Sequence, residues 1–292
     1  MNKLLIIILL LLTIFACDED NIFHYNDEDE QPTIVYGSEN TLEIMTWNIE
    51  EFTKSSQTIE IVRNLVDSLQ IDLIALQEIQ DSDDFVTLDN LLTNWQGQKA
   101  NSAYEDYNLA YLWNEDIEVN DIYEIYTDDS WAFPRNPLIM NMLFNDTEYI
   151  VINNHYKAYA DSEAVERRRL ASERLKSYID DNFPNDNVVV LGDLNDSLTD
   201  SSENNVFQNF IDSENYLFTD MEVAQSDYSN WSYLKVPSHL DHILISNELY
   251  DEFENENSKC STQIIESLVS GGKTEYIDNV SDHRPVVLKL SY

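Results

Sequence analysis

The sequence predicts an α/β protein built from mixed β-sheets. Short apolar runs of the kind that form strands alternate with segments whose apolar residues recur at helical spacing. Several of the strand-like runs between residues 107 and 155 follow one another without a helical segment between them. Because parallel neighbours need a long crossover connection, this succession favours mixed sheets over a simple doubly wound parallel sheet.

The first half of the domain is expected to interleave strands and helices. Residues 42–49 (LEIMTWNI) alternate as a strand does, and residues 57–69 carry an apolar stripe at helical spacing. The apolar run 71–79 predicts a buried strand, and residues 85–95 predict a second helix. Four further strands are then expected, at 107–113, 121–127, 138–144 and 148–155.

The second half begins with the longest expected helix, residues 162–181. The basic run ERRRLASERLK (166–176) within it favours a solvated helix face, with a phosphate-binding patch as the alternative. A buried strand (188–193) and a short helix (204–211) follow. Three strands are expected to complete the domain, at 240–246, 262–267 and 285–292.

The first 40 residues are not expected to belong to the folded domain. One lysine, an apolar run and a small residue before Cys17 predict a secretory signal peptide over residues 1–16. The position of Cys17 resembles the lipobox of bacterial lipoproteins, which implies a lipidated mature N-terminus; an ordinary signal peptide or a retained membrane anchor is the alternative. Residues 17–40 are acidic and predict a tether that resembles the surface-export signal of Bacteroidota lipoproteins. We therefore expect the domain to cover residues 41–292, held outside the cytoplasm at the outer membrane or cell surface.

The charge of the chain argues against a protein that binds nucleic acid through a basic surface. Lys and Arg total 16 against 56 Asp and Glu, for a formal net charge of −40. A surface of this kind repels polyanions. Any contact with a nucleic acid would therefore have to depend on local cations or on a bound metal ion.

Polar side chains stand at the ends of one expected strand after another. A single such residue is adequately explained by a turn or a cap, but six strand ends of this kind in one chain are not. Because ligands bind at strand ends in open α/β sheets, we expect these residues to form one site. They are Asn48, Glu78, His155, Asp193 with Asn195, Asp241 with His242, and Asp282 with His283.

These residue types suit the hydrolysis of a phosphate ester. Carboxylate and amide oxygens are hard ligands that predict Mg²⁺, with Mn²⁺ or Ca²⁺ as alternatives. Histidines beside carboxylates suit general acid–base catalysis. Such a metal offsets the charge that develops on the phosphoryl oxygens while an activated water attacks. The sequence contains neither an HExxH motif nor a Gly-rich phosphate loop, and it has only 5 glycines.

The motifs that carry these residues resemble those of the endonuclease/exonuclease/phosphatase superfamily, which includes pancreatic-type deoxyribonucleases, apurinic endonucleases, neutral sphingomyelinases and inositol-polyphosphate phosphatases. The resemblance spans about residues 42–292, and the combination of GDxN with SDHxPV is its specific part. It implies an α+β fold, a four-layer α/β/β/α sandwich with two packed mixed β-sheets. The motifs occur in the family's order: TWNIE (46–50), LQE (76–78), NNHYK (153–157), GDLND (192–196), LDHILIS (240–246) and SDHRPV (281–286).

The resemblance also implies a metal site and a general base. Asn48 and Glu78 would form the metal site, with Glu78 as the principal ligand, and Asp282 would complete or support it. His283 would activate the attacking water. Asp241 would orient the His283 ring, as carboxylates orient imidazoles in other enzymes.

The same resemblance implies a phosphate-binding group. Asp193 and Asn195 would hold the phosphate and the attacking or leaving oxygen, and an extended backbone is expected to place both on one face. Gly192 is then expected to ease the exit from the strand, and Asp196 to point away as solvated charge. His155 would donate to a phosphoryl oxygen, as in the deoxyribonuclease, sphingomyelinase and inositol-phosphatase branches but not in apurinic endonucleases.

Other positions are left with two interpretations. Arg135, which precedes a strand, is a candidate phosphate contact or a structural residue. Lys157 is a candidate substrate-binding residue or a solvated lysine, and the NHxK arrangement resembles secreted bacterial nucleases. A tyrosine joins the site in several branches of the family, but Tyr104, Tyr107 and Tyr111 are equivalent candidates at this point.

Together these features predict a divalent-metal-dependent phosphodiester hydrolase, in the first place an endonuclease that cuts DNA. A phospholipid headgroup phosphodiesterase or a phosphatase of small phosphorylated molecules is the alternative, which the acidic surface and the lipid anchor suit. A binding module without activity is disfavoured because no residue of the expected site is missing. The expected partners are a phosphodiester substrate and, through the anchor, a membrane; no protein partner is inferred.

Overall fold

The structure is a computed structural model of the 292-residue chain and describes residues 37–38, 40–103 and 107–292. All of them belong to one compact unit, Pro32–Tyr292. The expected signal peptide, Cys17 and nearly all of the expected tether lie outside the described residues, so these expectations stay predictions. Within the described ranges, no helix combines the length and the apolar character that a membrane span requires.

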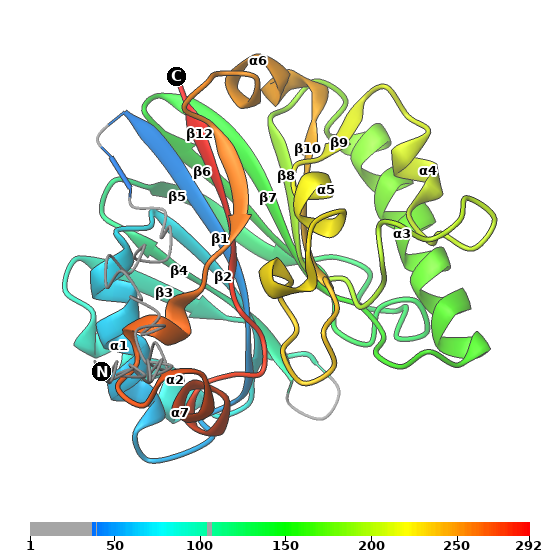
Figure 1. Cartoon of the computed structure of the whole chain (residues 1–292). Helices are drawn as coiled ribbons and strands as arrows, with labels where there is room; N and C mark the ends of the chain where they lie inside the picture. The colour runs from blue at the N-terminus through cyan, green and yellow to red at the C-terminus, as the bar shows by residue number, and fades with distance from the viewer. Residues whose placement is uncertain (1–36, 39, 104–106) are drawn as a thin grey trace, which may run out of the picture. The chain divides into compact units, whose positions relative to one another are not determined.

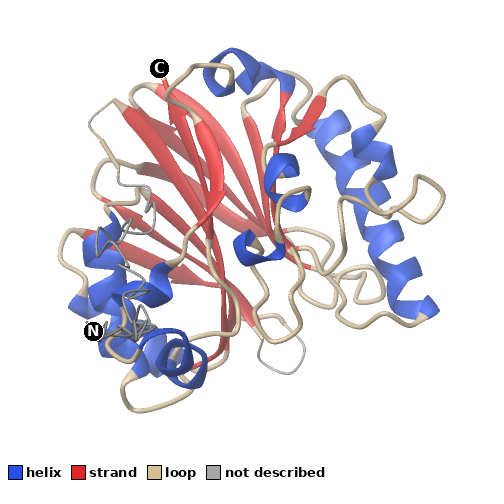
Figure 2. Cartoon of the chain, in the orientation of Figure 1, coloured by secondary structure: helices blue, strands red, loops and turns tan. Residues whose placement is uncertain are grey.

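Two six-stranded mixed sheets form the centre of this unit (Figures 1 and 2). In each sheet one central pair is parallel, β1 with β2 or β7 with β8, and the other pairs are antiparallel. The first sheet runs β11 (Lys259–Thr262), β12 (Val286–Ser291), β1 (Thr41–Phe52), β2 (Leu73–Ile79), β4 (Asn108–Asn114), β3 (Trp95–Lys99). The second runs β5 (Glu118–Glu124), β6 (Leu138–Phe144), β7 (Thr147–His155), β8 (Val188–Asp193), β10 (Asp241–Ser246), β9 (Tyr216–Phe218).

Helices cover the outer face of each sheet, so that the described residues form four layers (Figure 1). One apolar cluster combines the first sheet with α1 (Thr58–Leu69), α2 (Ser82–Leu91) and α7 (Gly272–Asn279). A second cluster fills the space between the sheets, and a third joins the second sheet to α3 (Ser162–Asn182) and α4 (Gln208–Ile211). The expected α/β/β/α sandwich is therefore confirmed. Short helices complete it: α5 (Met221–Ala224), α6 (Tyr250–Phe253) and the 3-10 turns Tyr228–Asn230, Asn247–Leu249 and Ile265–Leu268.

The central strands are apolar on both faces because both faces are covered. In β8, Val189 and Leu191 pack between the sheets, whereas Val188 and Val190 pack against α3 and its neighbours. A strand buried in this way reads as a continuous apolar run instead of an alternating one. This explains why the VVVL segment has no polar residue until the strand reaches the site.

Several expected boundaries are wrong where short or irregular elements interrupt a pattern. The second helix ends at Leu91, and Trp95 begins the edge strand β3, which was not expected from the sequence. Only Gln208–Ile211 is α-helical within the helix expected at 204–211. The strand expected at 262–267 lies earlier in the chain, at Lys259–Thr262. Pairing with β12 stops at Thr262, and a 3-10 turn follows at Ile265–Leu268.

A buried ionic cluster fastens the second sheet to the segment after β8. Asp220 Oδ2 accepts from His239 Nε2 at 2.9 Å and from His242 Nδ1 at 2.6 Å, while His242 Nε2 donates to the Asp196 carbonyl at 2.8 Å. Burial lowers the pKa of His242, but the Asp220 carboxylate outweighs this and raises it above the usual value. Because a carboxylate faces Nδ1 and a backbone carbonyl faces Nε2, both ring nitrogens of His242 act as donors, which makes the ring an imidazolium. The three side chains have ligand atoms within 4.8 Å of one another, but these hydrogen bonds already account for their spacing without a metal ion.

Gly192 is required by the close approach of two strands. It lies inside β8, between Asn154 of β7 and His242 of β10, with a φ of 143°. A Cβ at this position would stand 1.9 Å from the Asn154 carbonyl oxygen. Its role is therefore to let β7 approach, and the expectation that it eases the exit from the strand is wrong.

We expect Gly192→Ala to lower the free energy of unfolding by more than about 1 kcal/mol, because the new Cβ must push β7 away at a positive φ. Gly272→Ala is the matched control, since Gly272 also has a positive φ, 67°, but a Cβ added there would meet no atom within 4 Å. Chemical denaturation of both variants measures the difference. An equal loss in the two would show that backbone strain alone, and not the approach of β7, requires Gly192.

Candidate functional site

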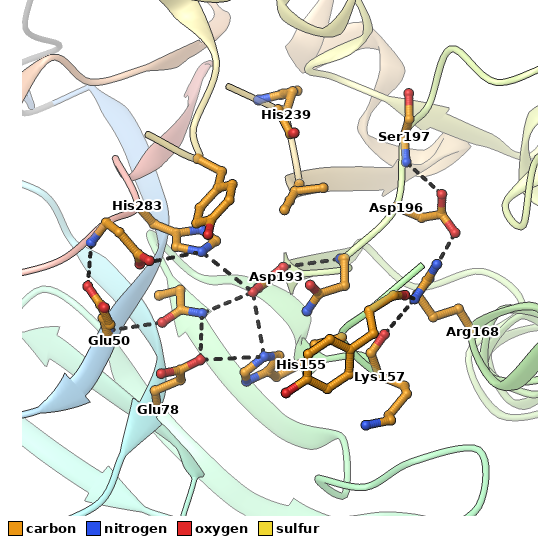
Figure 3. Close-up of a pocket in the computed structure, with 18 of the residues that line it drawn as sticks. Glu50, Glu78, His155, Lys157, Arg168, Asp193, Asp196, Ser197, His239 and His283 are labelled. Carbon is orange, nitrogen blue, oxygen red and sulfur yellow. Dashed lines mark hydrogen bonds and ion pairs between the residues drawn. The ribbon is translucent and has the colours of Figure 1, made fainter. Parts of the chain in front are cut away.

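The polar strand ends come together in one cavity of about 760 Å³ (Figure 3). Side chains from both sheets and from the loops that follow them line it. Two of the expected strand-end residues do not line it: Asp241 lies fully buried behind His283, and His242 is fully buried in the cluster with Asp220, so the expectation that His242 joins the site is wrong. The predicted residues on the wall are Asn48, Glu78, Arg135, His155, Lys157, Asp193, Asn195, Asp282 and His283.

Strand register explains why residues so far apart in the sequence meet. Asp193, the last residue of β8, is paired with His155 of the parallel strand β7 and with Asp241 of the antiparallel strand β10. Side chains of paired residues project from the same face of a sheet. Asn48 of β1 approaches from the other sheet and donates from Nδ2 to Asp193 Oδ2 at 2.9 Å. The cavity therefore lies where the ends of the two sheets meet.

Asp193 occupies the centre of these contacts. Besides the bond from Asn48, its Oδ1 accepts from the Asn195 backbone N–H at 3.1 Å. Its Oδ2 lies 3.5 Å from His155 Nε2 and 4.0 Å from His283 Nε2. Burial raises the pKa of Asp193 to about 7, although the positive charge of His283 and the Asn48 hydrogen bond act in the opposite direction.

Glu78 and Asp282 add two more carboxylates to the cavity wall. Asn48 Nδ2 donates to Glu78 Oε1 at 3.1 Å, and the Glu51 N–H donates to Glu78 Oε2 at 3.1 Å. Burial raises the pKa of Glu78 and of Asp282, in part opposed for both by the charge of His283. A buried carboxylate that resists ionisation in this way signals negative charge without enough compensation.

This excess of buried negative charge fits a divalent cation. Carboxylate oxygens are the preferred ligands of Mg²⁺ and similar ions, and the added charge would stabilise the ionised form of each acid. Glu78 and Asp282 would hold the ion. Asn48 points its amide nitrogen at Glu78 and Asp193, and its Oδ1 accepts from the Glu50 N–H at 3.0 Å. It therefore orients the carboxylates, and its role as a ligand stays a prediction.

His283 forms a pair with Asp241. Its Nδ1 lies 2.7 Å from Asp241 Oδ2, and its Nε2 faces the cavity, 3.8 Å from Asp282 Oδ1. Burial lowers the pKa of His283, but Asp241, Asp193 and Asp282 outweigh this and raise it to about 10. The ring accepts a proton from water only once these charges are offset, as a cation at the site would do. The ligand atoms of Asp193, Asp241 and His283 lie within 4.8 Å of one another, but the short Nδ1–Oδ2 contact is that of a hydrogen-bonded pair.

The pKa of His155 is shifted in the opposite direction to that of His283. Burial lowers its pKa well below the usual value, and the positive charges of Arg135 and His283 add to this effect. The ring is therefore neutral. Its Nε2 lies close to Asp193 and 3.8 Å from Glu78 Oε1, while its Nδ1 has no hydrogen-bond partner among the described residues. A neutral imidazole of this kind can donate one N–H into the cavity.

The segment after β8 differs from expectation in two ways. Asn195 is not extended but left-handed, with a φ of 54°, and it reaches the cavity because its Nδ2 donates to the Tyr156 carbonyl at 3.2 Å. Asn tolerates this conformation better than most residues. Asp196 is not solvated charge, since its Oδ2 accepts from Arg168 Nε at 2.8 Å. Arg168 is only 3% exposed, so the basic run on α3 is not a solvated face at this residue.

The structure separates the candidate tyrosines. Tyr107 lines the cavity and donates to Glu51 Oε1 at 2.8 Å. Tyr111 is buried between the sheets, where its hydroxyl contacts the Leu138 and Val151 carbonyls, so it does not reach the cavity. Tyr104 lies outside the described residues. Arg135 and Lys157 line the cavity, where Arg135 stacks over the Tyr107 ring with 5.5 Å between guanidinium and centroid.

Lys235, which no sequence pattern indicated, pairs with two acids of the site. Its Nζ donates to Glu50 Oε1 at 2.6 Å and lies 2.8 Å from Asp282 Oδ2. Glu50 Oε2 in turn accepts from the Asp282 N–H at 2.8 Å. Glu50 is part of the TWNIE motif, so the sequence could have indicated that it belongs to the site. Lys235 lies in a loop without a recognisable pattern, and only the tertiary fold brings it to Glu50 and Asp282.

Comparison with known proteins identifies the fold and the family. The model of the Endonuclease/Exonuclease/phosphatase family matches residues 45–283, whereas no curated protein matches the chain. The human Nocturnin catalytic domain with bound sulfate is similar in structure, with a TM-score of 0.66 and 16% identity over 89% of this chain and 97% of that one. So is an endonuclease/exonuclease/phosphatase from Bacteroides vulgatus, with a TM-score of 0.63 and 14% identity over 86% and 98%.

A third similar structure is D. rerio TDP2 complexed with a single strand DNA product, with a TM-score of 0.63 and 13% identity over 86% of this chain and 99% of that one. At these identities the structural similarities show the fold alone. The family match covers most of the chain, including five of the six motifs in full and the first three residues, SDH, of the sixth. The chain therefore belongs to the Endonuclease/Exonuclease/phosphatase family, whose members are metal-dependent phosphoric ester hydrolases.

Proposed function

We propose that this protein is a divalent-metal-dependent phosphodiesterase that cuts DNA, with His283 as the general base. One observation carries the proposal: the His283–Asp241 pair faces the same cavity as Glu78, Asp193 and His155. A base, an orienting carboxylate, a metal-binding acid and a hydrogen-bond donor are thus within reach of a single phosphate.

The chain's own residues divide the work of hydrolysis among them. The divalent ion, bound by Glu78 and Asp282, would supply positive charge to the phosphoryl oxygens. His283 Nε2 takes the proton of the attacking water, and Asp241 stabilises the imidazolium that forms. Asp193 orients the water.

On the other side of the phosphate, His155 donates its Nε2–H to a phosphoryl oxygen. Asn195 positions the phosphate. Arg135 and Lys157, both on the cavity wall, add positive charge on this side. These local cations are the reason that a chain with a net charge of −40 can still accept a phosphodiester.

DNA is favoured as the substrate by the combination of family membership and the NHYK segment, and D. rerio TDP2 offers a relative of the same fold with a DNA product. The acidic surface instead favours the second candidate, a phospholipid headgroup or a small phosphorylated molecule. Both substrates would use the same catalytic residues, so the distinction depends on the loops around the cavity.

We further propose that the protein acts outside the cytoplasm as a lipoprotein attached through Cys17. The proposal rests on the N-terminal sequence alone. Wild-type protein expressed with labelled palmitate should carry the label, and Cys17→Ser should not. Absence of label from the wild type would contradict lipidation.

We expect wild-type protein to nick supercoiled plasmid with Mg²⁺ or Mn²⁺ and to lose this activity in EDTA. His283→Ala should lower kcat by roughly 10²- to 10⁴-fold, because the water then lacks its base. Gel assays of the two proteins, purified in the same way, measure the effect and correct for contaminating nucleases. A melting temperature equal to that of the wild type would show that the variant is folded.

A parallel panel of RNA, sphingomyelin and an inositol phosphate decides between the two substrate classes. Release of phosphocholine or phosphate without plasmid nicking would replace DNA by the second candidate. Plasmid cleavage that His283→Ala leaves intact would contradict the proposed role of His283.

A further inference from the structure

Tyr159 stands on the wall of the catalytic cavity with most of its ring in solvent. The side chain is 74% exposed, although the same cavity is lined by the buried residues His155 and Asp193. A single exposed aromatic residue is common on protein surfaces and needs no explanation by itself. The position of Tyr159 does need an explanation, because its backbone is held in a conformation that is unfavourable for tyrosine.

Tyr159 has a φ of 82°, in the left-handed region where a bulky side chain is a rare outlier. The conformation is fixed by Arg168, which is almost fully buried. Its Nη1 donates to the Lys157 carbonyl at 2.7 Å and to the Tyr159 carbonyl at 2.6 Å. Surrounding structure that enforces an unfavourable conformation beside a catalytic site indicates a function for the residue that is held there.

Arg168 also joins the segment of Lys157 and Tyr159 to the segment that follows β8. Its Nε donates to Asp196 Oδ2 at 2.8 Å, and Figure 3 shows the guanidinium between Asp196 and Lys157. Asp196 directly follows Asn195, which lines the cavity. The position of Tyr159 relative to Asp193 and Asn195 is thus set by one buried guanidinium, and no large loop movement is needed before a substrate binds.

The ring itself is oriented by Lys157. The ammonium nitrogen lies 4.8 Å from the centroid of the Tyr159 ring, which is a cation–π contact. One side of the ring is therefore occupied by a cation that also faces the cavity, and the exposed remainder is available to a ligand. A flat aromatic surface fixed beside a phosphate site matches the two parts of a nucleotide, a base and its phosphate.

We propose that Tyr159 is a stacking platform for a nucleobase adjacent to the scissile phosphate, so that the preferred substrate is single-stranded nucleic acid. The inference rests on the proposed phosphodiesterase function and narrows its substrate. A base within a duplex is already stacked on its neighbours and cannot lie on a side chain at the cavity rim. A base in a single strand is free to do so, and every base offers an aromatic face.

The acidic charge of the protein supports this type of contact. With a net charge of −40, general attraction to a polyanion is absent. Stacking supplies affinity that does not depend on positive charge. We therefore expect the contribution of Tyr159 to remain the same between low and moderate salt concentration, unlike that of a phosphate contact.

The test compares kcat/KM for three substrates of equal length: oligothymidylate, the same oligomer with tetrahydrofuran abasic residues in place of thymidine, and a blunt duplex. Wild-type protein should cleave oligothymidylate fastest. Tyr159→Ala should lower kcat/KM for oligothymidylate by roughly 5- to 100-fold, which is the range for loss of one base–aromatic stack. It should leave the rate on the abasic oligomer unchanged, and Tyr159→Phe should restore the wild-type preference.

Tyr228→Ala is the matched control, because Tyr228 is 64% exposed but does not line the cavity. This variant should cleave all three substrates as the wild type does. An equal loss on oligothymidylate and on the abasic oligomer in Tyr159→Ala would reduce Tyr159 to a structural role and overturn the inference, as would a wild-type preference for the duplex. Cleavage of the abasic oligomer upholds the phosphodiesterase function in either case, whereas failure of the wild type on all three substrates would overturn both.

Discussion

The burial of the Asp193 carboxylate where the ends of the two sheets meet is the constraint on which the rest of the site depends. Parallel pairing with β7 sets His155 beside it, antiparallel pairing with β10 sets Asp241 beside it, and Asn48 crosses from the other sheet to hydrogen-bond it. Gly192 permits this arrangement, because any side chain there would collide with β7. The geometry of the candidate site is thus a direct consequence of strand register.

Burial of these acids also leaves the site with uncompensated negative charge. Glu78, Asp193 and Asp282 all have pKa values that burial raises, while the pKa of His283 is raised to about 10 by the acids around it. Such a site is unfavourable for the stability of the protein without bound metal, and proteins retain groups of this kind where function requires them. Lys235 offsets part of the charge through Asp282.

The layers of the fold and most of the residues that gather at the cavity could be predicted from the sequence, because long apolar runs mark buried strands and polar residues mark the ends of those strands. Other features could not. The pairs Arg168–Asp196 and Lys235–Glu50 join residues that are 28 and 185 positions apart, and only the tertiary fold brings them together. The left-handed backbone of Asn195 has no signal in a motif that reads as an extended strand end. The edge strand β9 has only 3 residues, too few for a pattern.

The central claim is that buried carboxylates at the ends of the sheets require a divalent cation. Melting temperatures of wild-type protein and of Glu78→Gln, each measured with and without Mg²⁺, test it most directly, because ions bound loosely to the acidic surface affect both proteins equally. The account predicts that Mg²⁺ raises the melting temperature of the wild type well above the shift seen in Glu78→Gln. Equal shifts in the two proteins would contradict it.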